Sequence, residues 1–192
     1  MSAIRLGTRA STLATTQSEM VAGLLRSEGL DVNLTTITTH GDTSTASLAA
    51  MGGIGVFASA IRAALLEGEA DIAVHSFKDL PTGRPLGLAI GAVPARADPR
   101  DALVARDGLT LHDLPQEASV GTGSPRRAAQ LLAVRPDLTI VDIRGNVDTR
   151  LGRVKGLGRY AKNGGKEDLD AVVLAASGLA RLGHSGTVTE FL

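Results

Sequence analysis

Arginine recurs in this sequence at places where a strand-like run gives way to a helix-like run. A guanidinium group suits carboxylate recognition because its planar fork donates two parallel hydrogen bonds. Any single arginine could be solvated or paired with a nearby acid, but six at similar places indicate a surface that binds carboxylates. The six are Arg9, Arg126, Arg127, Arg144, Arg150 and Arg181.

Two glycine-containing turns offer the same chemistry through the backbone. Residues 7–11 (GTRAS) and 121–124 (GTGS) each follow a predicted strand and open a predicted helix. Ser11 or Thr12 is expected to cap the first helix, and Ser124 the second, with Pro125 in its first turn. Such a turn presents unpaired N–H groups at the positive end of a helix, where anions bind. Ligands of open α/β sheets lie at the carboxyl ends of the strands. The two turns therefore predict a cleft between two domains that holds an elongated polyanion.

An acidic residue, Asp79, follows Lys78 shortly after the strand-like run DIAVHS and precedes Leu80-Pro81, which ends the strand and fixes the turn. An ionised carboxylate among arginines can accept a hydrogen bond from a ring N–H and stabilise a developing cation. An aspartate that caps the following turn would have the same spacing. The sequence alone leaves both interpretations of Asp79 open.

The composition excludes several classes of function. Lys plus Arg and Asp plus Glu number 20 each, so no overall basic field recruits nucleic acid, and only 2% of the residues are aromatic. The absence of cysteine excludes disulfides, a thiol nucleophile and thiolate metal sites. The four histidines are far apart and form no H-x-x-x-H pair, so we expect no metal site.

The expected cellular location follows from two features that the sequence lacks. No apolar run is long enough to span a membrane, and the start MSAIRLGTRAS lacks the charged-then-apolar layout of a signal peptide. We therefore expect a cytoplasmic protein that binds no membrane.

Strand and helix patterns alternate along the chain, which predicts an α/β fold with parallel-rich sheets and helices on both faces. The pattern restarts near residue 97, so we expect two doubly wound domains, residues 1–96 and 97–192, with a cleft between them. Residues 155–170, rich in glycine and lysine, are expected to form a solvated insertion. The predicted strands are 3–8, 32–38, 71–76, 88–95, 103–105, 119–122, 139–143 and 170–176, and the predicted helices are 13–25, 57–70, 126–134 and 178–182.

Successive segments of the chain resemble the signature segments of the porphobilinogen deaminase (hydroxymethylbilane synthase) family, in the family's order and along nearly the whole length. The resemblance is carried by RLGTRASTLATTQ, THGD, GGIGVF, DIAVHSFKDLPT, DPRDALV, VGTGSPRRAAQL, IRGNVDTRL and SGLARLG. It implies a transferase of haem biosynthesis that condenses four porphobilinogen molecules, with loss of ammonia, into hydroxymethylbilane. It also implies two domains similar to type II periplasmic binding proteins, and a monomer.

The resemblance assigns roles to individual residues. Asp79 would be the catalytic carboxylate that contacts pyrrole nitrogens. A dipyrromethane cofactor would be held in the cleft by Ser11, Lys78, Asp79, Thr122, Ser124, Arg126, Arg127 and Arg144. The substrate-binding residues would be Arg9, Arg144, Arg150 and Arg181.

The chain departs from the family pattern at several places. Ile54 stands where a lysine is common, and Gly123 stands where a serine is usual. The segment 155–168 is longer than is common. The family's third domain, with the cysteine that anchors the cofactor, is not in this sequence, so we expect the isolated chain to make no hydroxymethylbilane.

Two other classes of function use the same residue types. One is a non-catalytic module whose two lobes close on a carboxylated ligand. The other is a site for a sugar phosphate or nucleotide, although neither G-x-x-x-x-G-K-[ST] nor G-x-G-x-x-G occurs in the sequence.

Overall fold

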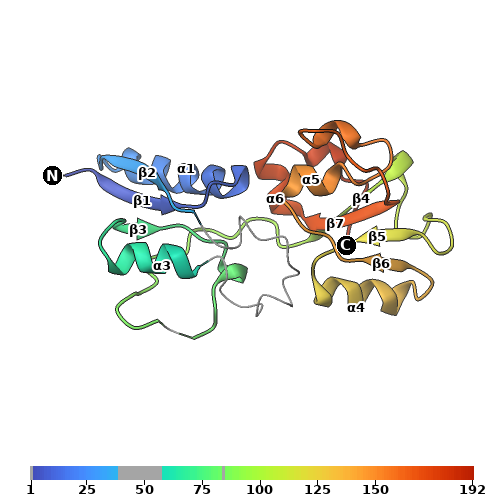
Figure 1. Cartoon of the computed structure of the whole chain (residues 1–192), viewed down its shortest axis with the longest axis horizontal. Helices are drawn as coiled ribbons and strands as arrows, with labels where there is room; N and C mark the ends of the chain where they lie inside the picture. The colour runs from blue at the N-terminus through green and yellow to red at the C-terminus, as the bar shows by residue number, and fades with distance from the viewer. Residues whose placement is uncertain (1, 39–57, 84) are drawn as a thin grey trace. The chain divides into compact units, whose positions relative to one another are not determined.

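A computed structural model of the chain describes residues 2–38, 58–83 and 85–192 (Figure 1). The chain divides into two compact units, Met1–Ala95 and Arg96–Leu192, where the sequence predicts a division between residues 96 and 97. Ile54 and His40 lie outside the described residues. None of the helices in the described ranges is long and apolar enough to cross a membrane.

The first unit is built on a small parallel sheet. Its strands are β1 (Ile4–Thr8), β2 (Val32–Thr36) and β3 (Ile72–Ala73), in the order β2-β1-β3. Helix α1 (Thr12–Ser27) joins β1 to β2, α3 (Ser59–Leu66) precedes β3, and a 3-10 turn, η1 (Phe77–Asp79), follows it. The predicted cap is confirmed, because the Ser11 hydroxyl accepts a hydrogen bond from the N–H of Ala14 at 3.3 Å.

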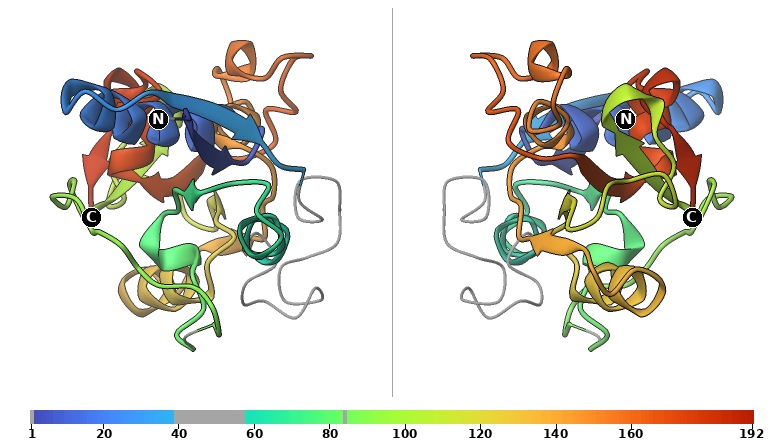
Figure 2. Two further views of the ribbon diagram at one scale, coloured as in Figure 1. Left: turned by 90° about the vertical axis from the view of Figure 1, so that its left-hand side faces the viewer. Right: turned by 90° about the vertical axis from the view of Figure 1, so that its right-hand side faces the viewer.

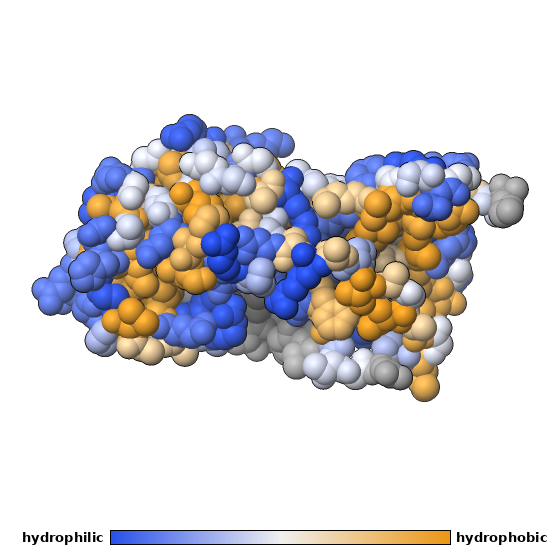
Figure 3. All heavy atoms as spheres, turned by 180° about the vertical axis from the view of Figure 1, so that it is seen from behind, coloured by the Kyte–Doolittle hydropathy of each residue, from blue (hydrophilic) through white to orange (hydrophobic). Residues whose placement is uncertain are grey.

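The core of this first unit is small. Leu6 of β1, Ala22 of α1 and Val32 of β2 form its buried centre. Three short strands cover little apolar surface, and large side chains such as Leu24, Leu66 and Leu86 remain exposed. Figure 3 shows apolar side chains, in orange, on the surface among polar ones.

The predicted strand 88–95 is wrong. Residues 88–100 form no strand, and all side chains from 89 to 100 are exposed. The run has a strand-like composition, but no described strand offers it a partner, and a strand needs a neighbour for its backbone hydrogen bonds. The predicted strand 71–76 is also shorter in the structure, where it ends at Ala73 and is half-buried.

The second unit contains a larger, mixed sheet with the order β6-β5-β7-β4-β8. Strands β5 (Ser119–Gly121), β6 (Thr139–Val141) and β7 (Ala171–Ala175) are parallel, whereas β4 (Asp101–Ala105) runs antiparallel to β7 and to β8 (Glu190–Phe191). The helices are α4 (Pro125–Val134), α5 (Val147–Leu151) and α6 (Ala176–Arg181), and η2 (Arg106–Gly108), η3 (Gly158–Tyr160) and η4 (Ser185–Thr187) are short 3-10 turns.

Side chains of this sheet alternate between two cores. Val172 and Leu174 of β7 enter one cluster with Leu151 of α5, whereas Val173 enters the other cluster with Leu131 of α4. Successive strand residues point to opposite faces, so helices cover both faces of the sheet, as Figures 1 and 2 show for α4 and α5. The predicted α/β fold with helices on both faces of a sheet is confirmed.

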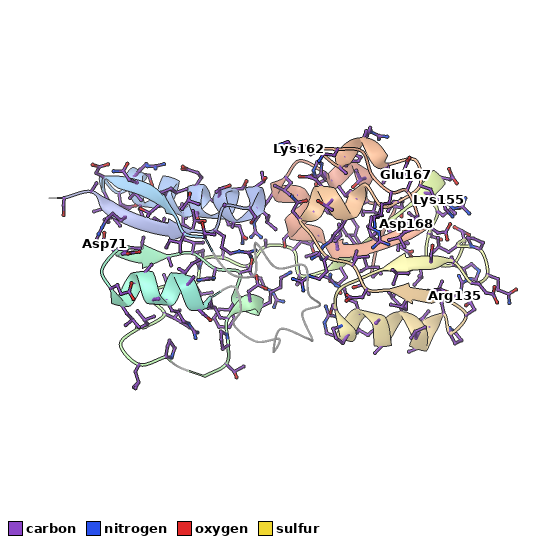
Figure 4. The ribbon with its side chains drawn as sticks, in the orientation of Figure 1. Asp71, Arg135, Lys155, Lys162, Glu167 and Asp168 are labelled. Atoms are coloured by element: carbon purple, nitrogen blue, oxygen red, sulfur yellow. The ribbon has the colours of Figure 1, made fainter. Side chains whose placement is uncertain are left out.

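The segment 155–170 is more ordered than the predicted solvated insertion. Most of its side chains are exposed, but Val154 and Leu169 form a parallel bridge beside the main sheet. The backbones of Gly152 and Gly165 pack so closely that a side chain at Gly165 would overlap the other glycine. Figure 4 labels Lys155, Lys162, Glu167 and Asp168 on this segment. Backbone packing therefore anchors a stretch whose composition suggests a loose loop.

Candidate functional site

The turn that follows β5 is held by its own hydroxyl groups. Ser124 caps α4, where its Oγ accepts from the N–H of Arg127 at 3.5 Å, and Pro125 occupies the first turn as predicted. The Oγ1 of the buried Thr122 accepts from the N–H of Ser124 at 3.3 Å. A hydroxyl that accepts in this way keeps its hydrogen as a donor. Both groups can therefore still donate to an anion beside the turn.

Two glycines allow this turn to lie against the loop after β6. A Cβ on Gly121 would lie 2.9 Å from Ile143 Cγ2, and a Cβ on Gly123 would lie 2.7 Å from the carbonyl oxygen of Ile143. The second contact is with backbone, which cannot rotate away as a side chain can. Gly123 is therefore required by the packing of this chain, where the resemblance leads one to expect serine.

An acidic residue that the sequence argument did not assign to the site, Asp101, binds the two arginines of α4. Its Oδ2 accepts from Arg126 Nη2 and its Oδ1 from Arg127 Nη2, both at 2.8 Å. Burial acts to raise the pKa of Asp101, but the hydrogen bonds from the two arginines outweigh burial and lower it. Asp101 therefore stays ionised between them.

The two arginines differ in their surroundings. The side chain of Arg126 is 63% exposed and also donates to Gln130, whereas that of Arg127 is 12% exposed and donates to the carbonyl oxygen of Val173. Among the residues that the structure describes, the buried Nε of Arg127 has no hydrogen-bond partner. A buried donor without an acceptor is costly, so this N–H is a candidate donor to a ligand.

Arg150 lies in the electrostatic field of two other arginines of the second unit, Arg127 and Arg144. Arg150, at the end of α5, donates to the carbonyl oxygen of Gly145 at 2.8 Å. Burial lowers its pKa, the positive charges of Arg127 and Arg144 lower it further, and Asp142 opposes them. A bound anion would relieve this repulsion. We refer to Arg127, Arg144 and Arg150 as the arginine cluster.

Arg181 lies on another element, in the last turn of α6. It is not among the charges that shift the pKa of Arg150. The structure therefore brings together three of the five arginines predicted in this unit, with Arg126 attached through Asp101.

In the first unit, three charged residues, Asp79, Arg62 and Arg9, lie near His75. Burial lowers the pKa of His75, Asp79 raises it, and Arg62 and Arg9 lower it. Asp79 ends η1, where its N–H donates to the carbonyl oxygen of Ser76 at 2.9 Å. Two predicted residues, Arg9 and Asp79, therefore lie around one imidazole with Arg62.

Side-chain contacts tie this part of the first unit to its helix. The Ser76 hydroxyl donates to Gln17 Oε1 of α1 at 3.1 Å. Lys78 is exposed and Asp79 half-buried. His75 and Arg62 are not among the predicted site residues, because a histidine within a strand-like run and an arginine in an alanine-rich helix carry no local signal.

The comparisons with known proteins agree on one family. A family model described as porphobilinogen deaminase, dipyromethane cofactor binding domain, matches residues 4–192. The porphobilinogen deaminase of Leifsonia xyli subsp. xyli is 60% identical over 190 residues, which are 98% of this chain and 55% of that protein. That of Micrococcus luteus is 59% identical over 197 residues, which cover 99% of this chain and 52% of that protein. The chain spans about half the length of the curated relatives it matches.

Solved structures resemble the chain in fold alone. A putative lipoprotein from Actinomyces odontolyticus aligns with a TM-score of 0.53 and 14% identity, covering 98% of this chain and 77% of that one. A periplasmic substrate-binding protein of an ABC transporter from Coxiella burnetii also has a TM-score of 0.53, with 17% identity and coverage of 98% and 79%. The predicted likeness to periplasmic binding proteins is confirmed.

Proposed function

Because this chain belongs to the porphobilinogen deaminase family, we propose that it binds the cofactor and substrate of an enzyme that makes hydroxymethylbilane. Four porphobilinogen molecules would be condensed, and each would lose ammonia. The arginine cluster is the observation that supports the proposal, since the positive charges of Arg127 and Arg144 act on the buried Arg150, and a ligand carboxylate would offset them. Porphobilinogen carries two carboxylates, which suit such a cluster.

The residues present fit a dipyrromethane cofactor with carboxylate side chains. The supporting observation is the buried Nε–H of Arg127, for which the described part of the chain supplies no acceptor. When bound, the group would supply the pyrrole chain that is extended. We propose that its carboxylates are held by Ser11, Lys78, Thr122, Ser124, Arg126, Arg127 and Arg144, and those of the substrate by Arg9, Arg144, Arg150 and Arg181.

Asp79 has a different proposed role. A carboxylate can accept a hydrogen bond from a pyrrole N–H, and it stabilises the positive charge that the ring acquires as ammonia leaves. Its neighbours Arg9 and Arg62 supply positive charge that can hold substrate carboxylates nearby. In a preparation that turns porphobilinogen over, we expect Asp79→Asn to lower kcat about 100-fold and to change KM about threefold or less.

Binding of porphobilinogen to the chain tests the proposal. We expect Arg150→Gln to weaken binding about tenfold, because a charge-assisted hydrogen bond is lost. Arg153→Gln is the matched control, since Arg153 follows closely in sequence but pairs with Asp168 at 2.6 Å. Affinity for porphobilinogen should exceed that for succinate and fall as salt rises. Equal affinity for the two ligands, or equal binding by Arg150→Gln, would contradict the proposal.

A further inference from the structure

The topology of the second sheet brings an acid to the edge where the arginines lie. Strand β4 runs antiparallel to β7, so its first residue, Asp101, pairs with Ala175, the last residue of β7. The parallel strands β5 and β7 end at this same edge, and α4 begins just after β5. Asp101 is thus separated from α4 in the sequence but lies beside its first turn.

Asp101 joins two side chains that would otherwise diverge. Arg126 and Arg127 are consecutive helical residues, and successive residues of an α-helix point about 100° apart. Each of the two carboxylate oxygens of Asp101 accepts from one arginine, at 2.8 Å in both cases. The carboxylate is largely buried, with 15% of its side chain exposed. One buried group therefore fixes the directions of both guanidinium groups.

Building on the proposed function, we infer that Asp101 is a positioning residue for carboxylate binding. It orients Arg126 and Arg127 so that their remaining N–H groups bind a ligand carboxylate. Among these groups, the buried Nε–H of Arg127 has no acceptor within the described residues. Arginine recognises carboxylates through a planar fork, so orientation matters as much as charge. Asp101 thereby raises affinity for an anion although it is itself an anion.

A second acid of the same unit provides the contrast. Asp142 acts on the electrostatics of Arg150, but it makes no hydrogen bond to an arginine within the described part of the chain. If charge alone mattered, removal of either acid would strengthen anion binding. If Asp101 positions the arginines, removal of Asp101 weakens anion binding, whereas removal of Asp142 strengthens it.

Succinate titrations at low salt test this inference. Asp142→Asn should strengthen binding about twofold, because one negative charge near the arginine cluster is lost. Asp101→Asn should weaken it about tenfold, because the arginines lose the acceptor that orients them. Asp101→Glu keeps the charge but displaces the carboxylate, and it should also weaken binding. Succinate bound equally or more tightly by Asp101→Asn would overturn the inference.

Spectroscopy separates positioning from a general loss of structure. In the wild-type chain, the arginine Nε–H resonance of Arg127 should shift as succinate is added, and in Asp101→Asn it should shift less while far-UV circular dichroism is unchanged. If neither Asp101 variant folds, Asp101 is a structural residue and the inference is wrong. If porphobilinogen binds no better than succinate, the proposed function fails. The role of Asp101 is still decided in that case, by whether Asp101→Asn weakens or strengthens succinate binding.

Discussion

Replacement of Asp170 by asparagine should destabilise the second unit more than any comparable change to an exposed carboxylate. Asp170 precedes β7 and connects three segments through its two oxygens. Oδ1 accepts from Arg106 Nε at 2.9 Å and from Lys155 Nζ at 2.8 Å. Oδ2 accepts from both the N–H and the hydroxyl of Ser119, each at 2.9 Å. Ser119 opens β5, the strand that leads to the Thr122 turn.

The expected loss of stability in Asp170→Asn follows from these contacts. Only 10% of the Asp170 side chain is exposed, and two cations share one of its oxygens. Asparagine keeps a single oxygen, and its NH2 group would face other donors. Removal of one partner from a buried, hydrogen-bonded charge network costs about 3 kcal/mol. We expect the free energy of unfolding to fall by about that amount.

Urea unfolding followed by far-UV circular dichroism measures the effect, and Asp168→Asn is the matched control. Asp168 lies close by in the sequence and pairs with Arg153 at 2.6 Å, but its side chain is 42% exposed. An exposed pair contributes about 1 kcal/mol or less. The reasoning is refuted if Asp170→Asn costs no more than Asp168→Asn.

Three further predictions concern pH and packing. Hydrogen bonding outweighs burial and lowers the pKa of Asp170. The ionised carboxylate therefore stabilises the fold above its unfolded pKa of about 3.9, and this stabilisation is lost as the pH falls below that value. The urea midpoint of unfolding should drop between about pH 7 and pH 3, and it should drop less in Asp170→Asn. The pKa of His75 is lowered mainly by burial, so its NMR titration midpoint should lie below about 6.5, and Asp79→Asn should lower it further. Since folding disfavours the charged imidazole, this group costs stability as pH falls below that value. Gly123→Ser should reduce the free energy of unfolding by about 1–3 kcal/mol, because the new Cβ would meet backbone atoms. Gly23→Ala lies in open space within α1 and should raise the free energy of unfolding by about 0.5–1 kcal/mol. Thermal unfolding of both variants measures whether each substitution lowers or raises stability.

Structural features that depend only on residues close together in the sequence could be predicted from it. Ser11 and Ser124 cap their helices as expected, because a cap needs only a hydroxyl and the N–H groups of the next turn. The alternation of strands and helices likewise identified the α/β fold. The run 88–95 shows the limit of such reasoning, since a strand requires a partner that local composition does not supply.

For the candidate site, the sequence by itself determined the residue types, with arginines and glycines at the turns that follow strands. Only the tertiary structure decided that Arg127 and Arg144 lie close enough to act on the charge of Arg150. It also brought Asp101 to the arginines, because β4 runs antiparallel to β7 and so begins at the edge where β7 ends. Strand direction and order are set by packing between distant segments, and no local pattern around Asp101 encodes them.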